Sequence, residues 1–270
     1  MSEIVEPKVA FYLRIKANCI KQTFAIIKSL VYNVTMLVTS AGITFVNIDR
    51  FQSSGHEIFL ASEKIAEQGD IFYVHTPETG PATPIILVFD ATILYQNLKR
   101  VNRNDFFEMW YHFDGAPVLS MRIKGEPGVS YIQIHSKDAP IYHCDVKGKT
   151  PNVIVNSKVF SDICTACHNV KCCKLKIEGY ANSAVFRGIN TNKISLYDHP
   201  VGTTNPWCEK VIEANIISQV FKPLNKLSVI SSKGDLSLYF DKGQVIISSQ
   251  IDRYGTYLIT IPKAEETSTK

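Results

Sequence analysis

The chain has 270 residues, of which 45% are hydrophobic and 20% are charged, the composition of an ordinary globular protein. Its 29 Lys and Arg against 25 Asp and Glu give a formal net charge of +4, too small an excess to identify a nucleic-acid-binding protein by itself. No apolar run approaches the roughly 18 residues of a membrane span, and the N-terminus has no hydrophobic signal core. We therefore expect an intracellular protein whose seven cysteines are reduced.

The first half begins with a strand and continues with an amphipathic helix. Apolar residues recur at i, i+4, i+7 and i+11 from Ile20, which predicts a helix over about 18–33. A second helix is expected to begin near Asp90. Segments rich in β-branched and aromatic residues, bounded by turn residues, predict strands. The strands expected in this half lie at 9–15, 35–39, 43–48, 58–60, 71–75, 85–89, 107–113, 118–123 and 129–134.

The segment 136–153 contains Pro140, Gly148 and Pro151 and has no sustained period, so we interpret it as a connector. The second half repeats the plan, with helices over about 157–169 and 213–224. Its strands are expected at 174–178, 184–189, 227–231, 236–240, 244–249 and 257–261. Two helices and about eight mostly antiparallel strands in each half predict an α+β fold. The predicted domains are 1–135 and 154–270, joined by the connector 136–153.

Two related sequence motifs indicate that the halves are duplicates. The pattern A-x-I-L-x-Q-x-L-K starts at Ala91, and A-x-I-I-x-Q-x-F-K starts at Ala214. Upstream of each motif, an apolar helical segment precedes a short extended segment, in the same order and at similar spacing. This repetition predicts a domain of about 130 residues that occurs twice.

Motifs for phosphate-binding loops, serine hydrolases and zinc peptidases are absent from the sequence. One cluster of possible ligands remains, because Cys164, Cys167 and His168 match C-x-x-C-H, and Cys172 follows. The first two cysteines fall on the apolar stripe of the helix at 157–169, where free cysteine behaves as a small hydrophobic residue. We therefore expect core cysteines, no metal and no cofactor, and keep a metal-binding or redox module as an alternative.

Basic residues cluster on the predicted helices, opposite their apolar sides. Such a surface attracts the phosphate backbone without reading bases, so we expect sequence-independent binding to double-stranded DNA. The third helix contributes less, because Asp162 and Thr165 occupy its exposed face. We find no stacking platform of aromatic residues in the sequence. The candidate DNA-binding residues are Lys21, Lys28, Lys99, Arg100, Arg103, Lys158, Lys222 and Lys226.

The opening of the chain is similar to that of the sliding clamps of the proliferating cell nuclear antigen (PCNA) type. The similarity lies in the helical segment at 20–30, the hairpin S-A-G-I-T-F at 40–45, the I-D pair at 48–49 and the I-P-K ending at 261–263. The resemblance implies a ring, usually of three chains, in which two similar clamp domains per chain turn their helices toward a central hole that holds duplex DNA. Gln52 and Ile259 depart from the family pattern, in which His and an aromatic residue are common, and the net charge is positive where the family is acidic.

The resemblance also implies two protein-binding surfaces. Client peptides of polymerases and other clamp-binding proteins would bind under the connector, with apolar and aromatic anchors. The residues implied there are Ile48, Gln52, Ile141, Tyr142, Ile259, Ile261 and Pro262. Neighbouring chains would join a late strand of the first domain to an edge strand of the second, which satisfies both unpaired edges. The residues implied there are Tyr131, Ile132, Val185 and Phe186.

The interpretation is a non-enzymatic DNA sliding clamp, a homotrimeric processivity factor of DNA replication and DNA repair that acts in the nucleus or at a cytoplasmic site of DNA replication. The alternative is a clamp-fold subunit of a hetero-oligomeric checkpoint clamp, or a monomeric polymerase accessory factor. From the sequence we expect Lys21→Glu combined with Lys99→Glu to lower clamp-stimulated synthesis and to leave the melting temperature nearly unchanged.

Overall fold

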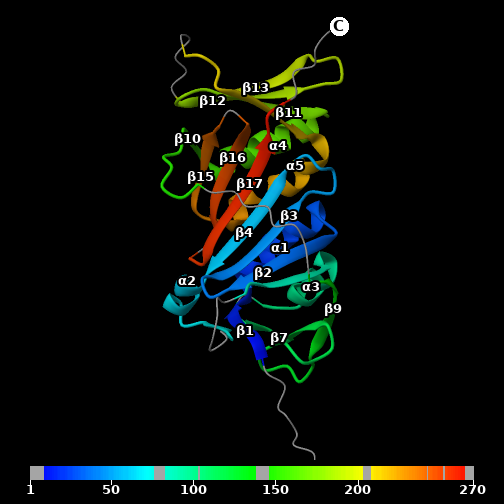
Figure 1. The fold of residues 1–270 in the computed structure, drawn as a ribbon. Coiled ribbons are helices and arrows are strands. Elements are labelled where there is room, and N and C mark those ends of the chain that lie inside the picture. The colour runs from blue at the N-terminus through cyan, green and yellow to red at the C-terminus, as the bar shows by residue number, and fades with distance from the viewer. Residues whose placement is uncertain are drawn as a thin grey trace, which may run out of the picture. The chain divides into compact units, whose positions relative to one another are not determined.

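The computed structural model describes residues 9–75, 83–102, 104–137, 146–202, 208–241, 243–251 and 253–264. The chain divides into two compact units (Figure 1). Each unit also includes a short segment from the part of the sequence that mainly forms the other unit. Unit 1 takes Met1–Asn47, Ile58–Ile141 and Arg253–Gly255, and unit 2 takes Ile48–Glu57, Tyr142–Asp252 and Thr256–Lys270. Within the described residues, no helix has the length and apolar character that would let it cross a bilayer.

Unit 1 combines antiparallel strands with two main helices. Its strands follow the order β3-β2-β6-β9-β8-β7-β1-β5. The strands are β1 (Val9–Lys16), β2 (Asn33–Thr39), β3 (Gly42–Ile48), β5 (Ile71–Val74), β6 (Ile85–Asp90), β7 (Phe106–His112), β8 (Val118–Ile123) and β9 (Ser130–Ser136), and β4 (Gly55–Ala61) is divided between the units at Glu57. The helices are α1 (Ala17–Leu30), α2 (Ser62–Glu67) and α3 (Ala91–Lys99).

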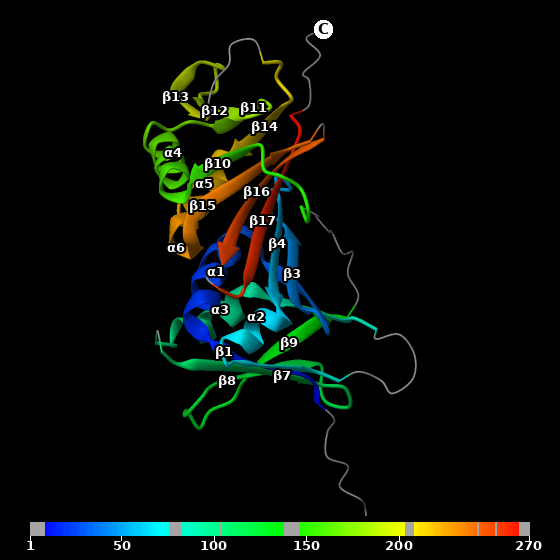
Figure 2. The ribbon, with the colours of Figure 1, turned by 90° about the vertical axis from the view of Figure 1, so that its left-hand side faces the viewer.

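Helices α1 and α3 pack side by side in unit 1 (Figure 2). The apolar stripe predicted from Ile20 is buried on α1, where Phe24 meets the ring of Phe45 edge to face at 4.9 Å between centroids. Leu94 and Leu98, four residues apart, are buried on α3. Asp90 begins α3, because its carboxylate accepts the backbone N–H groups of Thr92 and Ile93 and so satisfies two donors of the first turn.

Unit 2 repeats the plan of strand, helix, strands, helix and three closing strands. Its strands form two sets, in the orders β10-β15-β16-β17 and β13-β12-β11-β14. The strands are β10 (Val153–Asn156), β11 (Lys174–Gly179), β12 (Ser183–Ile189), β13 (Ser195–Gly202), β14 (Ile212–Ile217), β15 (Ser231–Phe240), β16 (Gln244–Ile251) and β17 (Gly255–Pro262). The helices are α4 (Ser157–Asn169), α5 (Ser218–Leu224) and α6 (Leu227–Ile230).

The predicted α+β class and the strands of the first half are confirmed, and the second half needs four corrections. The segment 213–217, expected to open a helix, belongs to strand β14, in which alternate residues are buried. The expected strand at 227–231 begins as helix α6, because Leu227 and Ile230 are buried three residues apart on one helical face. Strands β10 and β13 were not predicted. The short helix α2 was not predicted either.

The duplication has a different register from the one that the sequence motifs suggest. Helix α3 begins at Ala91, directly after β6, whereas the second motif begins at Ala214, inside β14, and helix α5 begins at Ser218. Aligning the two helix starts therefore pairs Lys99 with Lys226 rather than with Lys222. The duplication stands, and only the residue equivalence within it changes.

The cysteines at 164–172 belong to the core of unit 2. Cys164 and Cys167 are fully buried on α4, and burial raises the pKa of the Cys167 thiol to about 12. A Cβ atom on Gly188 would lie 2.7 Å from the Cys172 sulfur and 2.8 Å from the Cys167 sulfur, so both thiols pack directly on the glycine backbone. His168 is exposed and does not join them. Within the described residues, no three His, Cys, Asp or Glu side chains are grouped so that they could hold a metal ion.

Candidate functional site

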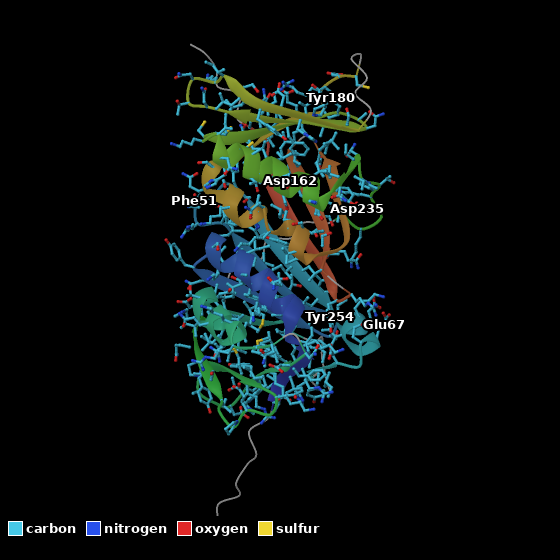
Figure 3. The ribbon with its side chains drawn as sticks, turned by 180° about the vertical axis from the view of Figure 1, so that it is seen from behind. Phe51, Glu67, Asp162, Tyr180, Asp235 and Tyr254 are labelled. Atoms are coloured by element: carbon cyan, nitrogen blue, oxygen red, sulfur yellow. The ribbon has the colours of Figure 1, made fainter. Side chains whose placement is uncertain are left out.

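Cations occupy exposed positions of the helices, where carboxylates are nearly absent. Across α1, α3, α4, α5 and α6, all within the described chain, the sole acidic residue is Asp162 on α4 (Figure 3). Exposed cations lie on or directly beside these helices, at Lys99, Arg100, Lys158, Lys222 and Lys226. Arg103 lies outside the described residues. Helices α1, α3, α4, α5 and α6 therefore carry positive charge with little neutralisation, whereas α2 carries Glu63 and Glu67 beside Lys64.

The two lysines of α1 lean on α3 instead of extending into solvent. Lys21 Nζ donates hydrogen bonds to the carbonyl oxygens of Lys99, at 3.1 Å, and Val101, at 2.7 Å. These carbonyls belong to the C-terminal end of α3, where a cation is favoured by the helix dipole. Lys28 Nζ lies 3.9 Å from the ring centroid of Tyr95 on α3, a cation–π contact. Lys21 is thus a structural cap as well as a positive charge.

Unit 2 has a hollow of about 150 Å³ beside the turn that links β3 to β4. One wall comes from this turn, and the other comes from the ends of β16 and β17. The hollow is lined by Ile48, Gln52, Ser53, Ser54, Gly55, Gln244, Thr260 and Pro262. Ile48 is 57% exposed, so an apolar side chain stands open at a site that also offers amide and hydroxyl groups. Concave sites of this mixed character are typical of ligand binding.

Asp49 holds the turn beside the hollow. Its carboxylate accepts the backbone N–H of Phe51 at 2.7 Å and that of Ser53 at 3.2 Å. It also accepts the hydroxyl groups of Ser53, at 2.7 Å, and Ser54, at 2.6 Å. Burial raises the pKa of Asp49, but these hydrogen bonds outweigh burial and hold the pKa below its usual value. The backbone at Gln52 has a φ of 56°, a left-handed conformation that this network stabilises.

A buried chain of hydrogen bonds continues from this turn into β17. Ser54 donates its proton to Asp49, so the 3.0 Å contact between its oxygen and His56 Nε2 makes Nε2 the donor. His56 Nδ1 then accepts the hydroxyl proton of Tyr257 at 2.8 Å. Burial lowers the pKa of His56 to about 4, and the charge of Asp49 opposes this only in part. His56 is therefore a neutral link that fixes one wall of the hollow to the strand forming the other.

Strand β13, of eight residues, lies at one end of a strand set in unit 2. Strand β12 pairs with β11 on one side and with β13 on the other, which leaves β13 at the end of its set (Figure 1). Pro200 lies in β13, in accord with the confinement of proline to edge strands within sheets. In unit 1, β9 pairs with β8 along Ser130–Gln133, whereas β6 reaches β9 only at Ile134 and Ser136.

Two solved structures with a similar arrangement of elements are a proliferating cell nuclear antigen (PCNA) and a complex of two PCNA chains. A PCNA from Entamoeba histolytica is similar with a TM-score of 0.68 and 13% identity, over 95% of this chain and 100% of that chain. A PCNA2–PCNA3 complex from Sulfolobus tokodaii is similar with a TM-score of 0.69 and 13% identity, over 94% of this chain and 100% of that chain. No protein-family model and no curated protein sequence matches the chain. The chain has the PCNA-type clamp fold.

The residues that the PCNA resemblance implied for peptide binding are only partly brought together. Ile48, Gln52 and Pro262 line the hollow. Ile259 and Ile261 do not, because both are buried in the core of unit 2, on the opposite face of β17 from Thr260 and Pro262. Ile141 and Tyr142 lie outside the described residues.

The sequence analysis missed five lining residues of the hollow. They are Ser53, Ser54, Gly55, Gln244 and Thr260. A signal was present for the first three, because an aspartate followed by serines and glycine is typical of a side-chain-stabilised turn. The connector contributes Val146, which packs against the pair formed by Ile246 and Leu258 on the sheet of unit 2.

The implied contact surface of the clamp chains also needs correction. Strand β12 was expected to be an edge, but it is paired on both sides, and β13 beside it is an end strand of the set. The side chains of Ile132 and Phe186 are fully buried, and Phe186 meets the ring of Phe160 in the core. Val185 is half-buried, and Tyr131 is exposed. Any contact between chains through these strands would therefore use backbone groups and Tyr131 more than Ile132 or Phe186.

The capping contact predicts that Lys21 contributes to stability, contrary to the sequence-based expectation. Replacing Lys21 with Met removes the ammonium group from the carbonyls of Lys99 and Val101. The expected loss is about 1 kcal/mol, a fall in melting temperature of roughly 2–4 °C in a calorimetric scan. The matched control is Lys222→Met, at an exposed lysine, which should leave the melting temperature unchanged. Equal melting temperatures for the two variants would contradict the capping role.

The pKa of His56 predicts a loss of stability in mild acid. The unfolded chain binds a proton near pH 6.5 and the folded chain only near pH 4, so the stabilisation is complete above about pH 6.5 and is lost as the pH falls toward 4. The loss across this window is roughly 3 kcal/mol, measured by urea unfolding at several pH values. In His56→Gln the free energy of unfolding should change less between pH 6.5 and 4.5, whereas His168→Gln should follow the parent protein. A parent profile that stays flat over this window would refute the prediction.

Proposed function

We propose that the protein is a DNA sliding clamp, a homotrimeric ring that encircles duplex DNA and tethers a polymerase to it without catalysing a reaction. The observation that carries this proposal is the charge on the helices of a clamp fold. Exposed cations accompany helices of both units, and Asp162 is the one carboxylate on α1, α3, α4, α5 and α6. In the proposed ring these helices face the DNA.

The kind of charge supports sliding rather than fixed binding. Exposed lysines such as Lys99, Lys222 and Lys226 present mobile ammonium groups, which attract phosphates at any position along the duplex. Sequence readout requires side chains that reach base edges with fixed geometry, and flexible lysines do not supply it. A ring held by topology needs only such weak contacts, because tight ones would stop its movement.

Strand edges support closure of the ring. An exposed edge is a template for pairing with another chain, and proteins generally cover or blunt it. We propose that β13 of one chain pairs with β9 of its neighbour, along Ser130–Gln133. Because donor and acceptor edges differ, this contact is head to tail, and repetition closes a ring. Tyr131, 62% exposed on β9, would be covered by this contact.

The hollow in unit 2 supports the recruitment of client proteins. Ile48 and Pro262 offer an apolar surface for an anchoring side chain, while Gln52 and Gln244 offer amide groups at its rim. A short peptide segment with apolar and polar residues fits a site of this size and character. Replication and repair enzymes would each bring such a segment to the clamp.

A hetero-oligomeric clamp is a second candidate. One of the similar structures is a complex of two different PCNA chains, PCNA2 and PCNA3. In that case β9 and β13 would pair with the edges of different partner chains rather than with each other's copies. Purified alone, the chain would then remain a monomer.

Reversing charge on the helices should weaken duplex binding. The double variant Lys99→Glu with Lys222→Glu is expected to lower the affinity for a fluorescent 30-base-pair duplex about tenfold or more at low salt, and to flatten the salt dependence. Two duplexes of unrelated sequence should be affected equally in an anisotropy titration. The control double variant, Lys149→Glu with Lys193→Glu, changes the same net charge at exposed positions away from the helices. If both double variants weaken binding alike, the helices are not the DNA-facing surface.

The hollow predicts a specific effect on client peptides. Ile48→Asp should weaken the binding of a synthetic clamp-binding peptide about tenfold by calorimetry, because a carboxylate replaces the exposed apolar contact. Ile154→Asp, at an isoleucine of similar exposure on β10, should leave the affinity unchanged. Unaltered binding to Ile48→Asp would place the peptide elsewhere.

A further inference from the structure

The sheet of unit 1 has a row of aromatic side chains on the face opposite its buried residues. Along β1 the buried residues alternate with Tyr12, Arg14 and Lys16. The register places Tyr12 directly opposite Tyr73 on β5 and Trp110 on β7. Residues opposite each other in an antiparallel pair share a face, with Cβ atoms about 5 Å apart. Three rings from three strands therefore form one continuous row.

This row is open to a ligand. Tyr73 is 50% exposed, and Tyr12 and Trp110 are half-buried. In Figure 2, α1 and α3 lie on the other side of the sheet that holds β1, β7 and β8, and no described helix covers the face with the row. Beyond Trp110, the register continues to Ser120 on β8. We define the aromatic face by Tyr12, Tyr73, Phe106, Trp110 and the cations beside them, Arg14, Arg122 and Lys124.

The cations of the aromatic face lie against its rings. The guanidinium carbon of Arg14 lies 5.2 Å from the ring centroid of Phe106, and Lys124 Nζ lies 5.5 Å from the same centroid. The guanidinium carbon of Arg122 lies 5.6 Å from the ring centroid of Trp110. Aromatic surfaces alternate with positive charge over the whole face, a combination that suits bases and phosphates together.

One carboxylate neutralises only part of this charge. Glu108 is the single acidic residue among those of β1, β5, β7 and β8 in the described structure. It forms an ion pair with Arg122 and accepts a hydrogen bond from the Tyr12 hydroxyl at 2.9 Å. Burial raises the pKa of Glu108, but the hydrogen bonds from Arg122 and Tyr12 outweigh it and lower the pKa below its usual value. Glu108 therefore stays ionised and fixes Tyr12 and Arg122 in place.

Arg14 lies opposite Glu108 in the register of β1 and β7 but has no ion pair within the described residues. Its Nε is buried and makes no hydrogen bond within the described residues, and no carboxylate in this part of the chain forms an ion pair with its guanidinium. An unsatisfied buried donor carries a cost in free energy that an arriving acceptor can relieve, directly or by reorienting the group. Phosphate is the acceptor that best matches the forked geometry of arginine.

We propose that the aromatic face binds single-stranded nucleic acid. Bases stack on Tyr73, Tyr12 and Trp110, and phosphates lie against Arg14, Arg122 and Lys124. Single strands fit because their bases are free to stack on protein rings, whereas the bases of a duplex are already stacked on each other. The excess of cations favours a phosphate backbone over an apolar protein surface. This binding site is separate from the helix cations and goes beyond the proposed clamp function.

The test is an anisotropy titration of a fluorescent 12-nucleotide oligo(dT) with the full-length chain at low salt. Tyr73→Ala and Trp110→Ala should each weaken binding about tenfold, within the range measured for loss of one stacked base. Trp110→Phe, which keeps a stacking ring, should bind within about threefold of the parent protein. Phe51→Ala is the matched control, because Phe51 is an exposed ring with Arg50 beside it at 4.9 Å, outside the aromatic face. It should bind as the parent does.

The salt dependence of oligo(dT) binding tests the contribution of the cations on the aromatic face. Lys124→Gln should reduce the slope of log affinity against log salt by about 0.7, the value for one phosphate contact on a single strand. Affinity for a 30-base-pair duplex should be unchanged in Tyr73→Ala and reduced in Lys99→Glu with Lys222→Glu, so the single-strand site and the proposed clamp surface can fail independently.

Three results would overturn the proposal. In the first, Tyr73→Ala and Trp110→Ala both bind oligo(dT) as the parent does while Lys99→Glu with Lys222→Glu does not, which would assign single strands to the helices. In the second, the parent chain shows no affinity for oligo(dT) at low salt. In the third, Tyr73→Ala changes the oligomeric mass and leaves oligo(dT) affinity unchanged, which would make the aromatic face a contact between copies of this chain.

Discussion

The alternation of side chains along β-strands decides which residues of this protein form its cores and which can meet a ligand. On β17, Ile259 and Ile261 are buried, and the intervening Thr260 joins Pro262 at the hollow. On β1 the same alternation leaves Tyr12 for the aromatic face, and on β7 it places Trp110 there together with the buried Glu108. A shift of one residue in either strand would exchange the two sets, so the sites depend on register as much as on residue identity.

Three surfaces of the two units differ in the charge and the kind of side chains that they carry. Helices α1, α3, α4, α5 and α6 carry lysines and a single carboxylate, which suits the duplex binding that we propose. The aromatic face of unit 1 combines cations with rings, which suits bases that are free to stack. The hollow of unit 2 is instead lined by uncharged groups and is held in shape by the buried chain from Asp49 through His56 to Tyr257. Each surface thus favours a different chemistry, and a loss of function at one need not affect the others.

The sequence predicted those features that depend on local periodicity. Helices α1, α3 and α4 follow from apolar residues spaced at helical intervals, and the strands of unit 1 follow from β-branched runs between turns. Strand β13 was missed because its residues are exposed or half-buried throughout, so no apolar alternation marks it. The start of α5 was misplaced because the alternating apolar run Ile212–Ile217 also resembles a helical segment over its short length.

Contacts between residues far apart in the chain account for the remaining differences between the predicted and the observed structure. Lys21 was interpreted as a DNA-facing charge, but its ammonium caps a helix whose end lies 78–80 positions away in the chain. The aromatic face unites β1, β5 and β7, and only strand register brings their rings together. Hydropathy along the chain identifies none of these contacts, whereas the overall clamp plan was recognisable from the first hairpin and the duplication.

Closure of a ring is the central claim, because topology is what allows weak lysine contacts to hold a clamp on DNA. It is tested most directly by the mass of the full-length chain in solution, measured by light scattering across the micromolar range. The account predicts a mass of three chains, stable on dilution through this range. A mass of one chain at all these concentrations would contradict it.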